Sequence, residues 1–221
     1  MRTEVIRIAQ KAKEASKILS RSTTATKNAV LLQMAEALME QAVGIKGKNA
    51  MDCAAAQQKG LSPAMIDRLT VSDKTIEEMA RGLREVANLP DPVGEVTGMW
   101  KRPNNLLVGR MRIPLGVIGI IYESRPNVTA DAAGLCLKSG NAVILRGGSE
   151  AFHSNQVIAG ILQDEAERGG IPREAISIIP FPEREAIYDL LQLEELIDVI
   201  IPRGDDSRAV GRPFQIGKGD G

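Results

Sequence analysis

The spacing of apolar positions changes at about residue 90. Before that point apolar residues recur three and four positions apart, which is typical of amphipathic helices. Examples are Val30, Leu31, Met34 and Leu38, followed later by Ile76, Met79, Leu83 and Val86. Breaks between helices are expected at residues 44–49 and 60–63, with Ser62 or Pro63 well placed to begin the next helix. The pattern predicts a helical shell over residues 2–89.

Residues 91–114 have a different texture. Apolar positions such as Val96 and Trp100 precede a turn at Pro103-Asn104-Asn105, and a second short apolar segment follows at residues 106–113. This order predicts a two-stranded arm. Because an isolated hairpin is only marginally stable in water, the arm is expected to pair with a partner sheet.

From residue 115 onward, short apolar runs alternate with helical patterns. The predicted strands are 115–121, 142–145, 175–179 and 197–201, and the predicted helices are 128–138, 152–168 and 184–193. Gly140 suits the left-handed position just past a helix end. Nearly unbroken apolar strands indicate a parallel sheet that is buried on both faces. The chain is therefore expected to have an α/β fold with at least four parallel strands.

Polar and glycine-rich residues gather where the first two of these strands end, at residues 122–127 and 146–150. Open parallel sheets bind ligands at the carboxyl ends of their strands. The two loops are therefore the predicted ligand-binding edge.

The second loop reads Arg146-Gly147-Gly148-Ser149-Glu150. In the functional interpretation, Arg146 and Ser149 hold the ribose and any phosphate of a dinucleotide. The two glycines let the backbone approach, and the amides of the following helix face the anion. The alternative is a tight turn with a surface arginine, which stays open because no G-x-G-x-x-G motif is present.

The first loop contains Glu123-Ser124-Arg125-Pro126-Asn127, which places a cation and two hydrogen-bonding side chains on the same edge. Its alternative interpretation is a loop that leads into a helix, with Asn127 as the capping residue.

Composition narrows the classes of partner. Lysine plus arginine and aspartate plus glutamate number 28 each, without a basic run, so neither nucleic acid nor an anionic membrane is an expected partner. The two cysteines are far apart, which fits a reducing compartment rather than a disulfide scaffold. No stretch reaches the roughly 18 apolar residues of a membrane span. A cytoplasmic chain with a small-molecule partner is expected.

Candidate nucleophiles and metal ligands are few. Cys136 lies inside a predicted helix between two leucines, and Cys53 lies on a polar helix, so both are interpreted as structural. His153, the only histidine, is expected in the first turn of a helix. No metal site or serine-histidine triad is predicted.

Four segments of the chain closely resemble the gamma-glutamyl phosphate reductases, also called glutamate-5-semialdehyde dehydrogenases. These segments are residues 93–96, 110–117, 122–127 and 138–148. The similarity runs from the N-terminal helices to about Gly204 and so covers most of the chain.

The resemblance implies the aldehyde dehydrogenase fold. Residues 1–90 would be the N-terminal helical part of the cofactor domain, and residues 91–114 a β-hairpin arm for oligomerisation. Residues 115–204 would form a Rossmann-like cofactor-binding core with a parallel sheet. Residues 205–221 are expected to be a divergent, disordered tail, and the family's catalytic domain is absent from this sequence.

The resemblance also implies an oxidoreductase of L-proline biosynthesis. The family reduces L-glutamate 5-phosphate with NADPH to L-glutamate 5-semialdehyde and phosphate, and assembles as homo-oligomers. Carried over by position, Arg146 reaches the adenosine ribose, and Ser149 lies where an acidic residue often reads the 2′-hydroxyl. A neutral serine favours NADPH because a carboxylate would repel the 2′-phosphate. The cofactor-binding residues are then Glu123, Ser124, Arg146, Gly147, Gly148 and Ser149, and the substrate-binding residues are Arg125 and Asn127.

The family's chemistry needs a cysteine thiolate that displaces phosphate and forms a thioester. Neither Cys53 nor Cys136 matches that position, so no catalytic residue is assigned, and the isolated chain is expected to be inactive. A second hypothesis is therefore a truncated, non-catalytic NADP-binding or assembly module. A third is a chain that lacks too many domain contacts to fold stably.

Overall fold

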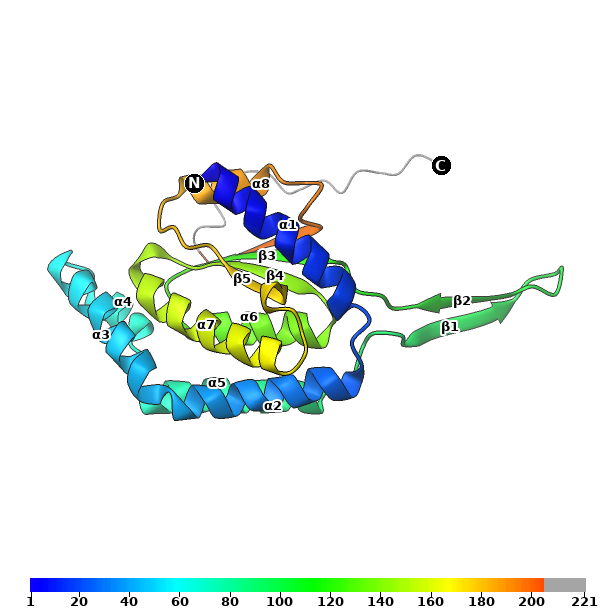
Figure 1. Cartoon of the computed structure of the whole chain (residues 1–221), viewed down its shortest axis with the longest axis horizontal. Coiled ribbons are helices and arrows are strands. Elements are labelled where there is room, and N and C mark those ends of the chain that lie inside the picture. Colours follow the sequence, from blue (N-terminus) through cyan, green and yellow to red (C-terminus); the bar gives the residue numbers. More distant parts are fainter. Residues whose placement is uncertain (205–221) are drawn as a thin grey trace.

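A computed structural model describes residues 1–204, so the expected tail at 205–221 lies outside the described residues. A four-stranded parallel sheet, in the order β5-β4-β3-β6, forms the centre of the molecule (Figure 1). Its strands are β3 (Val117–Tyr122), β4 (Ala142–Arg146), β5 (Ile176–Ile178) and β6 (Val199–Arg203). Every residue of β3 and β4 is buried, which explains their unbroken apolar sequences. The prediction of at least four parallel strands is confirmed.

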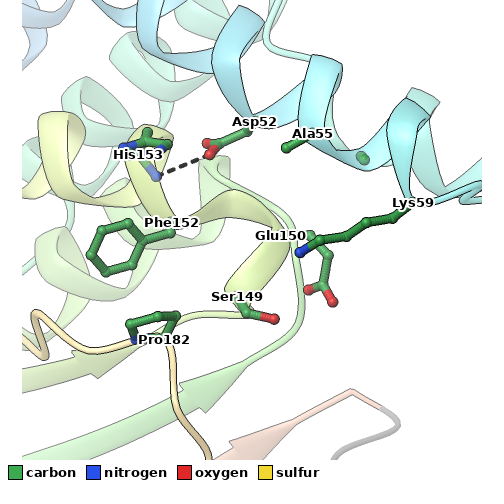
Figure 2. Close-up of a pocket in the computed structure, with 9 residues that line it drawn as sticks. Asp52, Ala55, Lys59, Ser149, Glu150, Phe152, His153 and Pro182 are labelled. Atoms are coloured by element: carbon green, nitrogen blue, oxygen red, sulfur yellow. Dashed lines mark hydrogen bonds between the residues drawn. The ribbon is translucent and has the colours of Figure 1, made fainter.

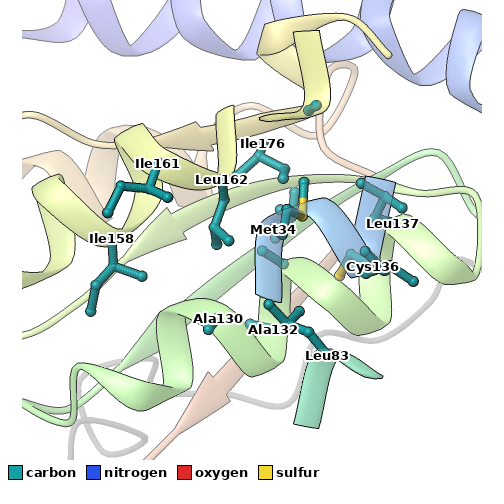
Figure 3. Close-up of a cluster of buried hydrophobic side chains, with 14 of the residues drawn as sticks. Met34, Leu83, Ala130, Ala132, Cys136, Leu137, Ile158, Ile161, Leu162 and Ile176 are labelled. Carbon is teal, nitrogen blue, oxygen red and sulfur yellow. The ribbon is translucent and has the colours of Figure 1, made fainter. Parts of the chain in front are cut away.

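Helices cover both faces of the sheet (Figure 1). α1 (Arg2–Leu19) and α8 (Glu185–Leu191) pack on one face, and α6 (Asn127–Lys138) and α7 (Phe152–Arg168) pack on the other. α2 (Thr24–Glu40) and α5 (Asp73–Asn88) form an outer layer over α6 and α7, where side chains from α2, α5, α6, α7 and β5 meet in one core (Figure 3). None of the helices within residues 1–204 combines the length and apolar character of a membrane span.

One predicted helix break is wrong. α3 (Ala42–Gln58) runs through residues 44–49, and the break falls at Gln41 instead. A glycine inside a helix costs only about 1 kcal/mol, and tertiary contacts outweigh that cost. Ile45 is fully buried, and the Asn49 side chain donates to Leu69 O and accepts from Val71 N.

The other predicted break is confirmed. α4 (Pro63–Leu69) begins with proline at its first position, and the Ser62 hydroxyl accepts a hydrogen bond from Met65 N.

Two short 3-10 helices, η1 (Ser149–Ala151) and η2 (Arg173–Ala175), precede α7 and β5. Gly140 has a φ of +74°, the left-handed conformation expected after α6.

The predicted arm is an antiparallel hairpin of β1 (Val96–Lys101) and β2 (Leu107–Met111) that projects from the body (Figure 1). Within residues 1–204 its strands pair only with each other. Its exposed apolar side chains are Val96, Met99, Trp100, Leu107 and Met111. The arm therefore carries apolar surface that the described part of the chain does not cover.

A buried ion pair joins the outer helices to the base of the arm. The Lys27 side chain of α2 is 1% exposed and its ammonium lies 2.7 Å from the Asp91 carboxylate. The same ammonium donates to Lys138 O at the end of α6. The carboxylate also accepts from Thr24 Oγ1 and from Val93 N. Because one carboxylate links α2 to the segment entering the arm, its charge is expected to matter for stability.

Candidate functional site

The two predicted loops lie together at one edge of the sheet. In the parallel register, Ile121 is opposite Arg146 and Tyr122 is opposite Arg203, so β3, β4 and β6 end at the same level. The Ser124 hydroxyl donates a 2.6 Å hydrogen bond to the Glu150 carboxylate and links the loops directly. The structure thus brings together the residues that the sequence placed at one ligand-binding edge.

Arg146 is buried and braces a neighbouring loop. Its guanidinium donates to Gly147 O and Pro182 O at 2.8 Å, and to Glu183 O at 3.3 Å. These carbonyls belong to its own loop and to the segment before α8. The alternative of a surface arginine is wrong, because the side chain belongs to a residue that is only 3% exposed. A contact from Arg146 to a ribose stays a prediction.

Close packing against other residues of the chain explains why positions 147 and 148 are glycines. A Cβ atom at Gly147 would lie 2.1 Å from the Asn155 amide nitrogen, and one at Gly148 would lie 2.2 Å from Ser124 Oγ. Neither distance leaves room for a side chain. The contacts within the chain are therefore sufficient to require glycine at both positions, without a ligand.

The amides at the start of α7 were expected to face the phosphate of a ligand, but an acid of the chain itself accepts from two of them. The Asp52 carboxylate of α3 accepts hydrogen bonds from His153 N, Ser154 N and Ser154 Oγ at 3.1, 2.7 and 2.6 Å. Two first-turn amides are thus taken by a carboxylate of the chain itself. His153 lies in this first turn, as predicted. Sequence reasoning missed Asp52, because nothing near it in the sequence indicates that it reaches α7.

Replacing Asp52 by alanine is expected to lower the free energy of unfolding by about 2 kcal/mol. The change would leave two backbone amides of α7 without their buried acceptor, much like the loss of a helix cap. Urea unfolding followed by circular dichroism would measure the change. Glu36→Ala, at an exposed position on α2, is the control, and equal stabilities of the two variants would contradict the prediction.

A first pocket, the α3–α7 pocket, has a volume of about 250 Å³ and lies between the end of α3 and the start of α7 (Figure 2). It is lined by Asp52, Ala55, Ala56, Lys59, Ser149, Glu150, Phe152, His153 and Pro182. Ser149, predicted to lie near the ribose, is exposed in this pocket. Lys59 was not predicted, because only the fold brings α3 to the end of β4.

A second pocket, the arginine pocket, has a volume of about 280 Å³ and lies beside the first. It is lined by Met65, Arg68, Glu123, Ser124, Arg125, Gly148, Glu150 and Arg184. Its three arginines come from α4, from the loop after β3 and from the segment before α8. Arg125 also pairs with Glu123 at 3.3 Å. No local pattern in the sequence placed Arg68 or Arg184 at this site.

Glu150 lines both pockets. Burial acts to raise the pKa of its carboxyl, but hydrogen bonds, including the one from Ser124, and the nearby charge of Lys59 lower it overall. Glu150 is therefore ionised near neutral pH, and a negative charge stands between the two pockets.

Asn127 is the first residue of α6, and it makes no side-chain cap for that helix. The alternative interpretation of Asn127 as a capping residue is therefore wrong, since Pro126 occupies the cap position. Asn127 lines neither of the two pockets. Its predicted role at a substrate stays a prediction.

The cysteines are packed as structural residues. Cys136, a residue of α6, lies in the hydrophobic core (Figure 3), and burial raises the pKa of its thiol to about 12. It is therefore a neutral thiol near pH 7. Cys53 is half-buried and lies 3.6 Å from the Asn49 side-chain oxygen. Within residues 1–204, no group of histidine, cysteine and acidic side chains is arranged to hold a metal ion.

Comparison with known proteins gives consistent matches. The model of the aldehyde dehydrogenase family matches residues 1–212. The gamma-glutamyl phosphate reductase of Geotalea daltonii is 63% identical over 204 residues, which are 92% of this chain and 49% of that protein. The one from Moorella thermoacetica is 57% identical over 195 residues, 88% of this chain and 47% of that protein. The chain spans about half the length of the curated relatives it matches.

Solved crystal structures of related proteins are similar to this chain in fold. The crystal structure of gamma-glutamyl phosphate reductase from Thermotoga maritima has a TM-score of 0.90 at 39% identity, over 92% of this chain and 49% of that one. The Saccharomyces cerevisiae structure of the same name has a TM-score of 0.83 at 33% identity, over 92% and 52%. A probable aldehyde dehydrogenase from Listeria monocytogenes, 17% identical with a TM-score of 0.71 over 96% and 45%, shares the fold.

Proposed function

The chain belongs to the aldehyde dehydrogenase family, and we propose that it is the cofactor-binding part of an enzyme of L-proline biosynthesis. That enzyme reduces L-glutamate 5-phosphate with NADPH to L-glutamate 5-semialdehyde and phosphate. The names of the relatives support this substrate. The observation that carries the proposal is the pair of adjoining pockets at the carboxyl edge of β3 and β4, where open parallel sheets take nucleotides.

The pockets have the chemistry that a dinucleotide needs. The guanidinium groups of Arg68 and Arg184 in the arginine pocket suit the phosphate oxygens of the dinucleotide. The α3–α7 pocket offers Ser149 to a ribose, and Phe152 and Pro182 to a base. When bound, NADPH would supply the hydride for the reduction. The predicted cofactor residues Glu123, Ser124, Arg146, Gly147 and Gly148 lie in the loops that form or brace these pockets.

For the substrate, we keep Arg125 and Asn127 in the loop after β3. Arg125 lines the arginine pocket and is suited to the acyl phosphate, because a guanidinium binds phosphate oxygens in a planar, bidentate way. Asn127 would act as a hydrogen-bond donor beside the reacting carbonyl. Ser149 would favour NADPH over NADH, as it adds no charge of its own near a 2′-phosphate.

The division of the chain follows from this function. We propose residues 115–204 as the cofactor-binding core, residues 1–90 as its helical part and residues 91–114 as an arm for homo-oligomers in the cytoplasm. The projecting hairpin with exposed apolar side chains supports the arm. The balanced charge of the sequence supports a small-molecule substrate rather than nucleic acid or a membrane.

A second candidate function is a nucleotide-binding or assembly module without chemistry of its own. The packing of the cysteines favours it, since Cys136 is a buried neutral thiol and Cys53 lines neither pocket. A thiolate nucleophile needs an exposed, electropositive setting, which neither position provides.

Calorimetry on the purified 221-residue chain tests the proposal. We expect saturable NADPH binding, which Arg68→Ala weakens about tenfold by removing a charged hydrogen-bond donor to phosphate. Arg81→Ala, on the exposed face of α5, is the matched control and should bind as the unaltered chain does. A folded chain that does not bind NADPH would contradict the proposal. Turnover of NADP⁺ with glutamate semialdehyde and phosphate by this chain would exclude the non-catalytic module.

A further inference from the structure

The α3–α7 pocket holds one cationic side chain among its lining residues, Lys59 at the end of α3. Figure 2 shows this side chain extending from α3 across the pocket toward Ser149 and Glu150. Within residues 1–204 no hydrogen bond or close ion pair holds its ammonium, which is therefore available to a ligand. It is nevertheless close enough to Glu150 for their charges to interact.

The two carboxylates of the pocket are not equivalent. Asp52 is buried, and three hydrogen bonds from the first turn of α7 hold its oxygens. The Glu150 carboxylate accepts hydrogen bonds from Ser124 and Ser149 and remains partly exposed between the two pockets. Glu150 is thus the acid that a ribose in this pocket would meet, and Lys59 is the cation whose side chain extends toward it.

The charges of Glu150 and Lys59 have opposite effects on the binding of NADPH relative to NADH. A carboxylate beside the ribose accepts hydrogen bonds from free hydroxyls and repels a 2′-phosphate, as in dinucleotide folds that select NADH. An ammonium at the same place attracts the phosphate. Ser149 is neutral and the Arg146 guanidinium donates to backbone carbonyls, so Lys59 is the cationic side chain that this pocket offers to a phosphate.

We propose that Lys59, beside the neutral Ser149, determines the cofactor preference by binding the 2′-phosphate of NADPH in the α3–α7 pocket and offsetting the charge of Glu150. This inference rests on the proposed function, because it assumes that the pocket takes the adenosine half of a dinucleotide. Lys59 lies at the end of α3. This position is outside the strand-loop-helix segment that carries the known sequence motifs of dinucleotide binding.

The test compares the dissociation constants of NADPH and NADH, measured by calorimetry on the whole chain. The unaltered chain should prefer NADPH, and Lys59→Ala should reduce that preference about tenfold by weakening NADPH while leaving NADH unchanged. Lys59→Arg should retain the preference. Glu150→Gln should strengthen NADPH binding, because it removes a like charge beside the phosphate.

The control is Lys48→Ala, an exposed lysine on the same helix that does not line the pocket. It should leave both dissociation constants unchanged. Lys59→Ala with an unaltered NADPH preference would overturn the inference while leaving the proposed function in place, since the lysine would then serve only the C-terminus of α3. Failure of the unaltered chain to bind either nucleotide would overturn both.

Discussion

Replacing Asp91 by asparagine is expected to lower the free energy of unfolding by about 3–5 kcal/mol at neutral pH. The substitution keeps the shape of the side chain and removes its charge. The Lys27 ammonium, from a side chain that is 1% exposed, would then lack its counter-ion in the interior. Leaving one charge of a buried pair uncompensated is among the most destabilising single changes.

The cost should depend on pH in a defined direction. Burial acts to raise the pKa of Asp91, but hydrogen bonds from Lys27, Thr24 and Val93 lower it overall from the ordinary value of 3.8. A carboxyl with a lowered pKa contributes stability that is present above its unfolded pKa and is lost as the pH falls through its folded pKa. The difference between the unaltered chain and Asp91→Asn should therefore be constant near pH 7 and narrow below about pH 4.

Urea unfolding at a series of pH values measures this difference. Asp73→Asn is the matched control, since its pair with Lys46 is exposed and is expected to contribute less than about 1 kcal/mol. If the two variants were equally stable at pH 7, the buried pair would have no special role. A difference that stayed constant into acid would show that charge is not its origin.

Replacing Gly147 by alanine is expected to lower the free energy of unfolding by about 3 kcal/mol or more. The new Cβ would lie 2.1 Å from the Asn155 amide nitrogen and 2.9 Å from the Tyr122 ring. Neither neighbour has room to move, because Thr129 links them in a buried chain of hydrogen bonds of 2.7 and 3.1 Å. Overpacking here must therefore shift the end of β3 or the start of α7.

Gly160→Ala provides the control for this clash. Gly160 lies in α7, where a Cβ would meet nothing within 4 Å, so alanine should stabilise the chain by about 0.5–1 kcal/mol through helix propensity. Opposite signs for the two substitutions in urea unfolding would support the packing argument. A Gly147→Ala variant as stable as the unaltered chain would mean that the loop relaxes freely.

Local sequence patterns were sufficient to predict most of the helices and strands. The apolar runs of β3 and β4 predicted a buried parallel sheet, Ser62 and Pro63 marked the start of α4, and Gly140 marked the end of α6. These signals succeed because burial on two faces, helix capping and left-handed backbone each restrict a few adjacent residues. The same reasoning failed at residues 44–49, where contacts from Ile45 and Asn49 hold a helix that local propensity disfavours.

The candidate site was predicted only in part. The sequence by itself determined which loops follow β3 and β4, because strand ends are visible as the limits of apolar runs. Only the tertiary structure decided which partners the residues of those loops contact and which residues from other elements join them. In the folded chain, the Arg146 guanidinium donates to backbone carbonyls, and amides of α7 donate to the Asp52 carboxylate. Lys59 and Arg68 line the two pockets. A side chain's partners across the molecule depend on how helices pack over the sheet, and no local spacing of residues encodes that geometry.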